Sequence, residues 1–461
     1  MNETGANAGP RSQNRDEGLA SRLAAAEILF RVDQESAYAD VLLGERLPEF
    51  APPDRRLITR LVLGTIAWQG RLDYELKHLT GRKLDGIQPV ALAILRMGLF
   101  QLRFLDRIPQ HAVVDTAVSL AKRNADSRKA QGFVNAVMRR ATRETAPMPS
   151  RERNEKSFLA VAFSHPRWMV ERFVDWFGVA DAERLMTADN EAAPNVIRLN
   201  LARGSRGEIL ERLGKHGFEI GADGRAPETI TLKSAPRFES DPYREGLFHA
   251  QSEASQMVAR MLGARAGATV ADCASAPGGK ATHLAEIVSE RGRVIAVDLN
   301  RNGLKNARDL ARRLRHNNVA FVCADLMTAL PLRAASLEYV LLDAPCTGLG
   351  TLREHPEIRW RLKPDDPARM AAIQLRMLEN AAALLRLGGA IVYSVCSLAP
   401  AEGDEVIDEF LKTHAEFAID QRPPNYDEVK DVLDARGFMK TRPDVGGLDG
   451  FFAARLIRRQ T

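Results

Sequence analysis

The stretch 269-TVADCASAPGGKATHLAEIV-288 contains a short apolar strand, a turn of small residues and the start of an amphipathic helix. Four more apolar strands follow, separated by helical segments: 293-RVIAVDLN-300, 319-VAFVCAD-325, 338-EYVLLDA-344 and 390-AIVYSVC-396. Strands that alternate with amphipathic helices are typical of βαβ units, which predicts a parallel sheet with helices on both faces. In such α/β folds ligands bind at the carboxyl ends of the strands.

The turn after the first of these strands is a candidate ligand loop. Its residues are Ala274, Ser275, Ala276, Pro277, Gly278, Gly279 and Lys280. Glycines let backbone approach a ligand closely. The spacing matches neither the Walker A pattern nor G-x-G-x-x-G. Alone, such a turn could equally be structural.

Acidic residues follow the next three strands at or near their ends: Asp298, Asp325 and Asp343. One such aspartate would often be a helix cap. Three of them, together with the glycine turn, favour a ligand that contains a nucleoside. Asp298 is placed to accept both ribose hydroxyls of that ligand.

Two cysteines follow the same pattern. Cys346 lies three residues past Asp343, and Cys396 ends the fifth strand. If these strands are neighbours, both thiols reach one cleft. The alternative is that each is a small buried hydrophobe, and we assign Cys273 and Cys323 to that class.

The part of the chain before residue 246 has a different pattern of apolar residues. Apolar residues recur at helical spacing from about 21 to 145, a charged and proline-containing linker follows, and the next segment mixes helical and strand patterns. We therefore expect a helical domain, a small α+β module and an α/β domain. The predicted segments are a disordered tail at 1–18, the helical domain at 19–146, the module at 158–245 and the α/β domain at 246–461.

The net charge of +5 comes from the N-terminal third of the chain. Residues 1–150 contain 22 basic and 17 acidic residues, and the remainder contains 43 of each. A basic cluster there could neutralise phosphates or could be a solvated helix face. It comprises Lys122, Arg123, Arg128, Lys129, Arg139, Arg140 and Arg143.

Other sequence features predict the environment of the protein. The N-terminus lacks the apolar core of a signal peptide, no stretch of eighteen apolar residues occurs, and the four cysteines have no paired spacing. We expect a soluble, cytoplasmic, monomeric protein with reduced thiols and no membrane association. The nine histidines show no metal-ligand spacing, so no metal is predicted.

At this point the chain resembles a known family. The motifs SAPGGK (275–280), DAPCTGLG (343–350), YSVCS (393–397) and LDGFFAARL (448–456) are similar to those of S-adenosylmethionine-dependent RNA cytosine-C5 methyltransferases. The closer resemblance, over nearly the whole chain, is to the bacterial 16S ribosomal RNA methyltransferase B family (RsmB type). It implies an all-α NusB-like RNA-binding domain, an α+β (RRM-like) module and a Rossmann-like methyltransferase domain.

The resemblance also implies roles for individual residues. Residues 274–280 and Asp298 would hold the methionine and ribose parts of S-adenosylmethionine, and Asp325 its adenine amino group. The remaining roles concern the base: Asp343 would face it, Lys280 would lie beside it and the cofactor, Cys396 would be the nucleophile, and Cys346 would assist product release.

The sequence departs from the family pattern in three places, and we expect these differences to affect rate and substrate preference more than reaction type. One extra residue separates Cys273 from Pro277, Val395 stands where Thr is common, and Glu402-Gly403-Asp404 replaces an acidic-Asn-acidic sequence.

The expected function is methylation of carbon 5 of a cytosine in 16S ribosomal RNA. Because the target base must leave its stack, a single-stranded or hairpin site is expected. Three alternatives remain open: a cytosine-C5 methyltransferase acting on another RNA such as tRNA, a DNA cytosine-C5 methyltransferase, and a non-catalytic NusB-like RNA-binding factor.

Overall fold

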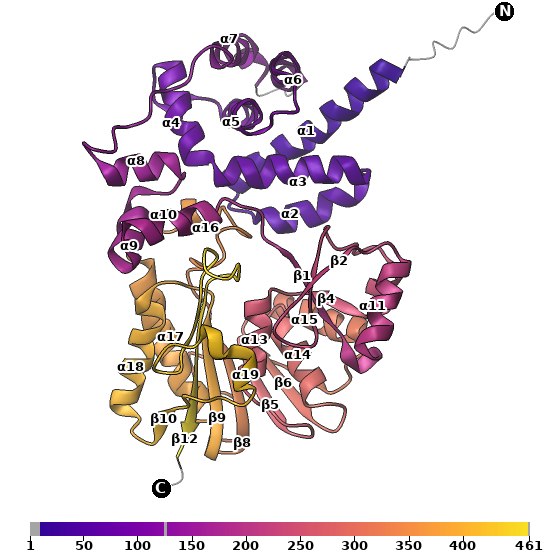
Figure 1. The fold of residues 1–461 in the computed structure, drawn as a ribbon, viewed down its shortest axis with the longest axis vertical. Coiled ribbons are helices and arrows are strands. Elements are labelled where there is room, and N and C mark those ends of the chain that lie inside the picture. Colours follow the sequence, from indigo (N-terminus) through magenta and orange to yellow (C-terminus); the bar gives the residue numbers. More distant parts are fainter. Residues whose placement is uncertain (1–9, 124–126, 460–461) are drawn as a thin grey trace, which may run out of the picture. The chain divides into compact units, whose positions relative to one another are not determined.

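A computed structural model of the chain describes residues 10–123 and 127–459. The chain divides into two compact units (Figure 1). The helical unit extends to Ala192 and also takes in Leu352–Arg361. The second unit comprises Ala193–Thr351 and the chain from Leu362 onward.

The helical unit packs its helices around α5, which buries most of its residues. Prolines in the first turns of α3 and α5 suit helix starts, where no backbone donor is needed. Gly81 takes the left-handed conformation that ends α4. The helices are α1 (Pro10–Gln34), α2 (Ala39–Arg46), α3 (Pro52–Ala67), α4 (Gln69–Thr80), α5 (Pro89–Phe104), α6 (Gln110–Arg123), α7 (Gln131–Ala141), α8 (Glu155–Ala162), α9 (Arg167–Phe177), α10 (Val179–Ala188) and α16 (Ile358–Arg361).

This arrangement differs from the predicted segments in two places. Residues 1–9 of the expected disordered tail lie outside the described residues, and residues 10–18 belong to α1. Helices α8 to α10, most of which we had placed in the small module, group with the helical unit. A helix pattern shows that an element exists, but only tertiary contacts show which core it joins.

The second unit begins with a small antiparallel sheet of order β2-β3-β1-β4. Helix α11 (Arg206–Lys215) starts with a capping box between Ser205 and Glu208. The apolar side chains of this sheet and α11 form one core. This is the predicted α+β module. Its remaining elements are β1 (Asn195–Leu199), β2 (Ile220–Asp223), β3 (Thr229–Leu232), α12 (Asp241–Arg244) and β4 (Phe248–Ala250).

A larger sheet forms the rest of the second unit, with the order β10-β12-β9-β8-β5-β6-β7 and β11 paired to β12. Its strands are β5 (Thr269–Cys273), β6 (Arg293–Asp298), β7 (Val319–Cys323), β8 (Leu337–Asp343), β9 (Leu385–Val395), β10 (Phe417–Ile419), β11 (Met439–Thr441) and β12 (Phe451–Arg458). Strands β5 to β9 pair in parallel, as predicted.

The sheet as a whole is mixed, because further strands pair antiparallel beyond the parallel part that the sequence predicted. Strand β12 pairs antiparallel with β9, and β10 and β11 pair antiparallel with β12. Strands buried on both faces look alike in sequence whichever way they run. Phe451 and Phe452 of β12 lie on opposite faces of the sheet, because each joins a different core.

Helices cover both faces of this sheet (Figure 1). On one face α13 (Glu253–Met261) and α14 (Gly279–Ile287) contribute to the core, and on the other α17 (Asp366–Ala382) and α18 (Asp404–Thr413) do so. The remaining helices are α15 (Arg301–Leu314) and α19 (Tyr426–Val429). Across the described residues, no helix has the length and apolar character needed to cross a membrane.

Candidate active site

The predicted site residues lie along the carboxyl edge of the parallel strands. Cys273 at the end of β5 pairs with Val297 of β6 on one side and Leu342 of β8 on the other. Asp343, the last residue of β8, pairs with Ser394 of β9. The loops that leave these strands therefore start at one level of the sheet.

The turn after β5 is held by hydrogen bonds to β6. The Ser275 N–H donates to the Val297 carbonyl (2.9 Å), and the Ala276 N–H donates to Asp298 Oδ2 (2.9 Å). Gly278 has a φ of +105°, and a Cβ there would lie 2.7 Å from Ala307 of α15. This glycine is required for backbone conformation and for packing of α14 against α15, rather than for approach to a ligand as the sequence suggested.

The polar groups around this turn fit a cofactor with nucleoside and amino-acid parts. Asp298 binds the Ala276 and Asn300 N–H groups, yet each carboxylate oxygen can accept a second hydrogen bond. At this turn and at the end of β5, Ser275 Oγ and both carboxylate oxygens of Asp272 are buried without hydrogen-bond partners. Burial raises the pKa of Asp272 well above its usual range. Such orphaned atoms indicate a place built for a polar ligand.

Asp325 lies in the loop after β7, where its Oδ1 accepts the Met327 N–H (2.9 Å). Its side chain is partly exposed, so a ligand can reach it.

Lys280 and Asp343 connect the turn to the strands that carry the cysteines. Lys280 Nζ donates to Asp343 Oδ2 (2.7 Å) and lies 5.4 Å from the centre of the Phe451 ring. The other oxygen of Asp343 accepts the Ser394 hydroxyl (2.7 Å), two residues before Cys396. A continuous set of hydrogen bonds therefore joins the SAPGGK turn to the YSVCS segment.

The two thiols expected to share a cleft do so. The sulfur atoms of Cys346 and Cys396 lie 3.2 Å apart, and both side chains are partly buried. The hydrogen bond to Cys396 and burial raise the pKa of the Cys346 thiol well above its usual range. Cys346 therefore stays protonated at neutral pH and can donate its S–H to the Cys396 sulfur.

Glu402 holds both cysteine segments, and the sequence reasoning missed this role. The side chain is fully buried. Its oxygens accept the Thr347 N–H (2.9 Å) and hydroxyl, the Ser397 hydroxyl (2.5 Å) and the Gln374 amide (3.0 Å). The residue following each thiol is thus bound to one carboxylate. We had noted Glu402 only as part of a departure from the family pattern, although its place six residues after Cys396 was a usable signal.

Close backbone packing brings three of the quoted motifs together. The Gly350 N–H donates to the Cys396 carbonyl (3.0 Å), and its own carbonyl accepts the Gly450 N–H (2.7 Å). A Cβ at Gly350 would lie 1.9 Å from the Gly450 oxygen, so no other residue fits. DAPCTGLG, YSVCS and LDGFFAARL therefore meet at one point.

Arg198 is a second residue that the sequence reasoning missed. It extends from β1 of the small sheet and is fully buried. Its guanidinium donates to the Gly279 carbonyl (2.7 Å), Thr282 Oγ1 (3.0 Å) and Glu286 Oε1 (2.9 Å). The small module thus fixes the start of α14, where the turn ends. A charged residue inside the apolar strand NVIRLNL was the signal.

The structure also tests the residues that we had set aside. Cys273 is buried as expected, and burial raises its pKa. Cys323 is exposed, which corrects its assignment as a buried hydrophobe: it is the last residue of β7, an edge strand of the sheet. Trp360 packs against the helical core, and its indole N–H donates to the Ile66 carbonyl (2.8 Å).

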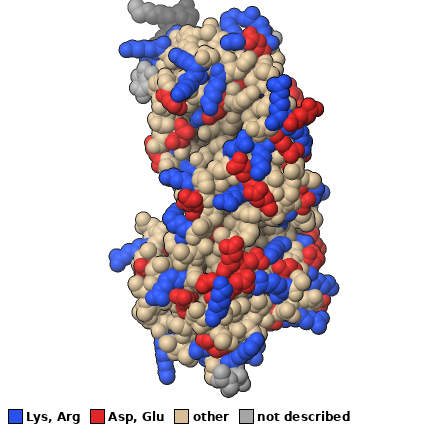
Figure 2. Space-filling view, turned by 90° about the vertical axis from the view of Figure 1, so that its left-hand side faces the viewer, with Lys and Arg blue, Asp and Glu red and all other residues tan. Residues whose placement is uncertain are grey.

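The basic cluster lies on α6, on α7 and in the segments that follow each of these helices. All seven side chains are exposed, and among the described residues only Arg140 forms an ion pair, with Glu144 (2.8 Å). In Figure 2 Lys and Arg side chains are visible at the end of the helical unit that carries α6 and α7. Solvated cations without acidic partners remain available to phosphates.

The fold and the site at the strand edge define a Rossmann-like methyltransferase. Comparison with known proteins shows which family of methyltransferases the chain belongs to. Residues 259–457 match the model of the 16S rRNA methyltransferase RsmB/F family, residues 19–143 match the NusB family, and residues 165–239 match a ferredoxin-like domain of RsmF/B-like methyltransferases.

Curated relatives align over nearly the full length. The chain is 37% identical to ribosomal RNA small subunit methyltransferase B of Thermus thermophilus over 95% of this chain and 97% of that one. It is 32% identical to the probable enzyme of that name from Bacillus subtilis, with coverages of 94% and 98%. Among solved structures, the crystal structure of PH0851 aligns with a TM-score of 0.83 and 26% identity, covering 96% of this chain and 98% of that one.

The chain belongs to the 16S rRNA methyltransferase RsmB/F family. It is an S-adenosylmethionine-dependent RNA methyltransferase with a NusB helical domain, a ferredoxin-like module and a Rossmann-like catalytic domain.

Proposed function

We propose that this protein methylates carbon 5 of a specific cytosine in 16S ribosomal RNA through a covalent adduct with Cys396. The observation that carries the proposal is the 3.2 Å approach of the Cys396 and Cys346 sulfurs beside Asp343 and Lys280. Relatives named ribosomal RNA small subunit methyltransferase B support the choice of RNA.

The pair of thiols supports different roles for the two cysteines. Carbon 5 of cytosine is a weak nucleophile, and addition of a thiolate to carbon 6 makes it reactive. The raised pKa of Cys346 keeps that thiol protonated, which suits its proposed role in product release, and the family resemblance gives the role of nucleophile to Cys396. Cys396 adds to carbon 6, and carbon 5 then accepts the methyl group. Removal of the carbon 5 proton, by a base or by water positioned by Cys346, breaks the bond between carbon 6 and sulfur and frees Cys396.

Asp343 and Lys280 are suited to bind the base during this addition. A carboxylate accepts a hydrogen bond from the exocyclic amine of cytosine, and the Lys280 ammonium 2.7 Å away keeps the local charge balanced as electron density moves onto N3. The Ser394 hydroxyl fixes the second oxygen of Asp343 and hence the direction of the carboxylate.

The cofactor supplies an electrophilic methyl group on a sulfonium. Ala274 to Lys280 and Asp298 would hold its methionine and ribose parts, and Asp325 its adenine. The buried, unpaired Ser275 hydroxyl and the free lone pairs of Asp298 provide the polar partners.

The proposal is tested with Cys396→Ala, Cys346→Ala and the matched control Cys323→Ala, an exposed cysteine at the far edge of the sheet. Each variant is incubated with 16S RNA and S-adenosylmethionine. We expect Cys396→Ala to lose methyl transfer and adduct formation, and Cys346→Ala to leave protein attached to RNA on a denaturing gel. The control should match the wild type.

The opposite pattern for the two cysteines would exchange their roles, and no adduct in any variant would refute the covalent mechanism. Bisulfite sequencing of ribosomal RNA from cells with and without the protein identifies the nucleotide. Preference for a DNA oligonucleotide or for tRNA would favour one of the other substrates. Failure to bind S-adenosylmethionine in calorimetry would favour a non-catalytic factor.

A further inference from the structure

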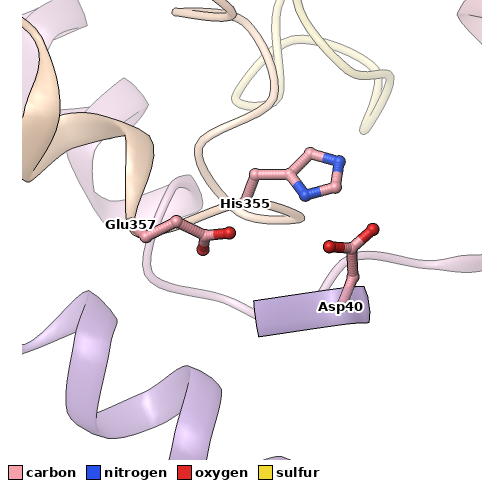
Figure 3. Close-up of side chains that lie close together, drawn as sticks. All are labelled: Asp40, His355 and Glu357. Carbon is pink, nitrogen blue, oxygen red and sulfur yellow. The ribbon is translucent and has the colours of Figure 1, made fainter. Parts of the chain in front are cut away.

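Three side chains that are distant in sequence converge within the helical unit. Asp40 lies in the first turn of α2, and His355 and Glu357 lie in the 352–361 segment. One possible ligand atom from each lies within 4.8 Å of the other two, and the imidazole and both carboxylates point toward a common space (Figure 3). We propose that Asp40, His355 and Glu357 bind one divalent transition-metal ion, for which Zn²⁺ is the probe.

Glu357 is almost fully buried, with only 1% of its surface exposed. One oxygen, Oε1, accepts the Ala39 N–H (3.1 Å). The other, Oε2, is buried without a hydrogen-bond partner, and so is His355 Nδ1. A buried carboxylate oxygen that lacks a partner costs free energy, and a bound cation removes that cost.

No neighbouring cation fills this role. Among the described residues, no Lys or Arg forms an ion pair with Glu357. Arg361, four residues later, donates instead to the carbonyls of Val32 (3.1 Å) and Ala37 (2.6 Å), and its guanidinium lies over the Tyr38 ring. Among the described residues, the Glu357 carboxylate therefore has the Ala39 N–H as a partner but no cationic side chain.

The ligand set and its dimensions fit zinc. Nitrogen and oxygen ligands lie about 2.0–2.2 Å from Zn²⁺, so two ligands of a tetrahedral site are roughly 3.3–3.6 Å apart. The three ligand atoms lie within 4.8 Å of one another, so binding the ion requires shifts of up to about an ångström, which the exposed side chain of Asp40 can make. Three protein ligands leave a fourth position for water on the exposed side.

The mixture of one imidazole and two carboxylates also distinguishes among metals. Imidazole suits Zn²⁺ and other late transition metals, whereas Mg²⁺ prefers an octahedral set of oxygens. We therefore expect binding of Zn²⁺ and much weaker binding of Mg²⁺. The ion would link the 352–361 segment to the start of α2 and stabilise the helical unit by mass action.

This inference departs from our sequence-based expectation of no metal. That expectation considered only the spacing of histidines along the chain, and Asp40 lies 315 residues before His355. The proposal does not rest on the proposed methylation chemistry.

The test measures Zn²⁺ binding to the full-length chain after chelator treatment. Thiols are zinc ligands, so Cys346 and Cys396, whose sulfurs are adjacent, are both replaced by alanine in every sample. Calorimetry should show one equivalent of Zn²⁺ bound, with affinity falling at least roughly tenfold in Asp40→Asn and in His355→Gln. His111→Gln, an exposed histidine of α6, is the matched control and should bind as the parent does.

A second measurement monitors the thermal unfolding of the helical unit alone. All four tryptophans, at 68, 168, 176 and 360, belong to that unit. Zn²⁺ should raise the midpoint of thermal unfolding followed by tryptophan fluorescence, and Mg²⁺ at equal concentration should not. Loss of both effects in Asp40→Asn, whose side chain is exposed and whose shape is unchanged, supports the site. Absence of Zn²⁺ binding to the parent, or equal binding by the variants, overturns it.

Discussion

The sulfur atoms of Cys346 and Cys396 lie 3.2 Å apart at the ends of neighbouring strands, and one buried carboxylate holds the residue that follows each of them. This relationship makes the chemistry of the pair accessible to direct tests.

We predict that mild peroxide inactivates methyl transfer reversibly. Each peroxide molecule oxidises the two thiols to one disulfide and is reduced to two water molecules. Intact-mass analysis should show the loss of two hydrogens, and dithiothreitol should restore both mass and activity. Cys323→Ala should behave as the wild type, whereas Cys346→Ala should not form the bond. Oxidation confined to Cys323 would contradict the prediction.

We predict that Glu402→Ala lowers kcat by about ten- to a hundredfold. Glu402 positions the segments that carry both thiols, and small displacements of reacting groups lower the rate strongly. The change leaves the Thr347 and Ser397 donors unsatisfied, which costs about 1–3 kcal/mol of unfolding free energy for each buried group. Binding of S-adenosylmethionine, measured by calorimetry, should change little. The control is Glu405→Ala, an exposed glutamate of α18. Unchanged kcat in Glu402→Ala would show that the thiols are positioned by other contacts.

We predict that Arg198→Met weakens S-adenosylmethionine binding roughly tenfold, since the Gly279 carbonyl at the start of α14 loses its donor. The buried Glu286 also loses its cationic partner, which destabilises the second unit by about 3–5 kcal/mol. Calorimetry and urea unfolding measure the two effects. Arg203→Met, at an exposed position of the same module, is the control. Normal cofactor affinity in a folded Arg198→Met protein would refute the link.

We predict that the helical unit loses stability as the pH falls below about 6.5. Burial, assisted by the charge of Arg359, lowers the pKa of His165 to about 4, despite the nearby Asp189 carboxylate. The unfolded chain therefore takes up the proton first, and the stabilisation by neutral His165 is fully present above pH 6.5 and lost between pH 6.5 and 4. The loss is about 1.4 kcal/mol per pH unit in that window.

Tryptophan fluorescence measures this effect in urea unfolding at pH 7.5 and 5.5, because all the tryptophans lie in the helical unit. The difference in unfolding free energy between the two pH values should shrink in His165→Asn. It should persist in His78→Asn, which replaces an exposed histidine. An equal difference in both variants would assign the pH dependence to other groups.

Much of the fold was predictable because periodicity is a local property. The helical spacing of the N-terminal part, the alternation of strands and helices after Gly246, and the positions of Asp298, Asp343 and Cys396 at or just past strand ends all follow from short stretches of sequence. Strand order then places those residues along one edge, since parallel neighbours end at one level.

Tertiary structure decided what depends on contacts between distant segments. The direction of β12, the membership of α8 to α10, the buried contacts of Arg198 and the convergence of Asp40 with His355 and Glu357 have no local signature. By itself the sequence determined the elements and the chemical groups they carry. Which groups share a core or a pocket was decided only by the packing of the folded chain, because burial and hydrogen bonding depend on neighbours that are remote in sequence.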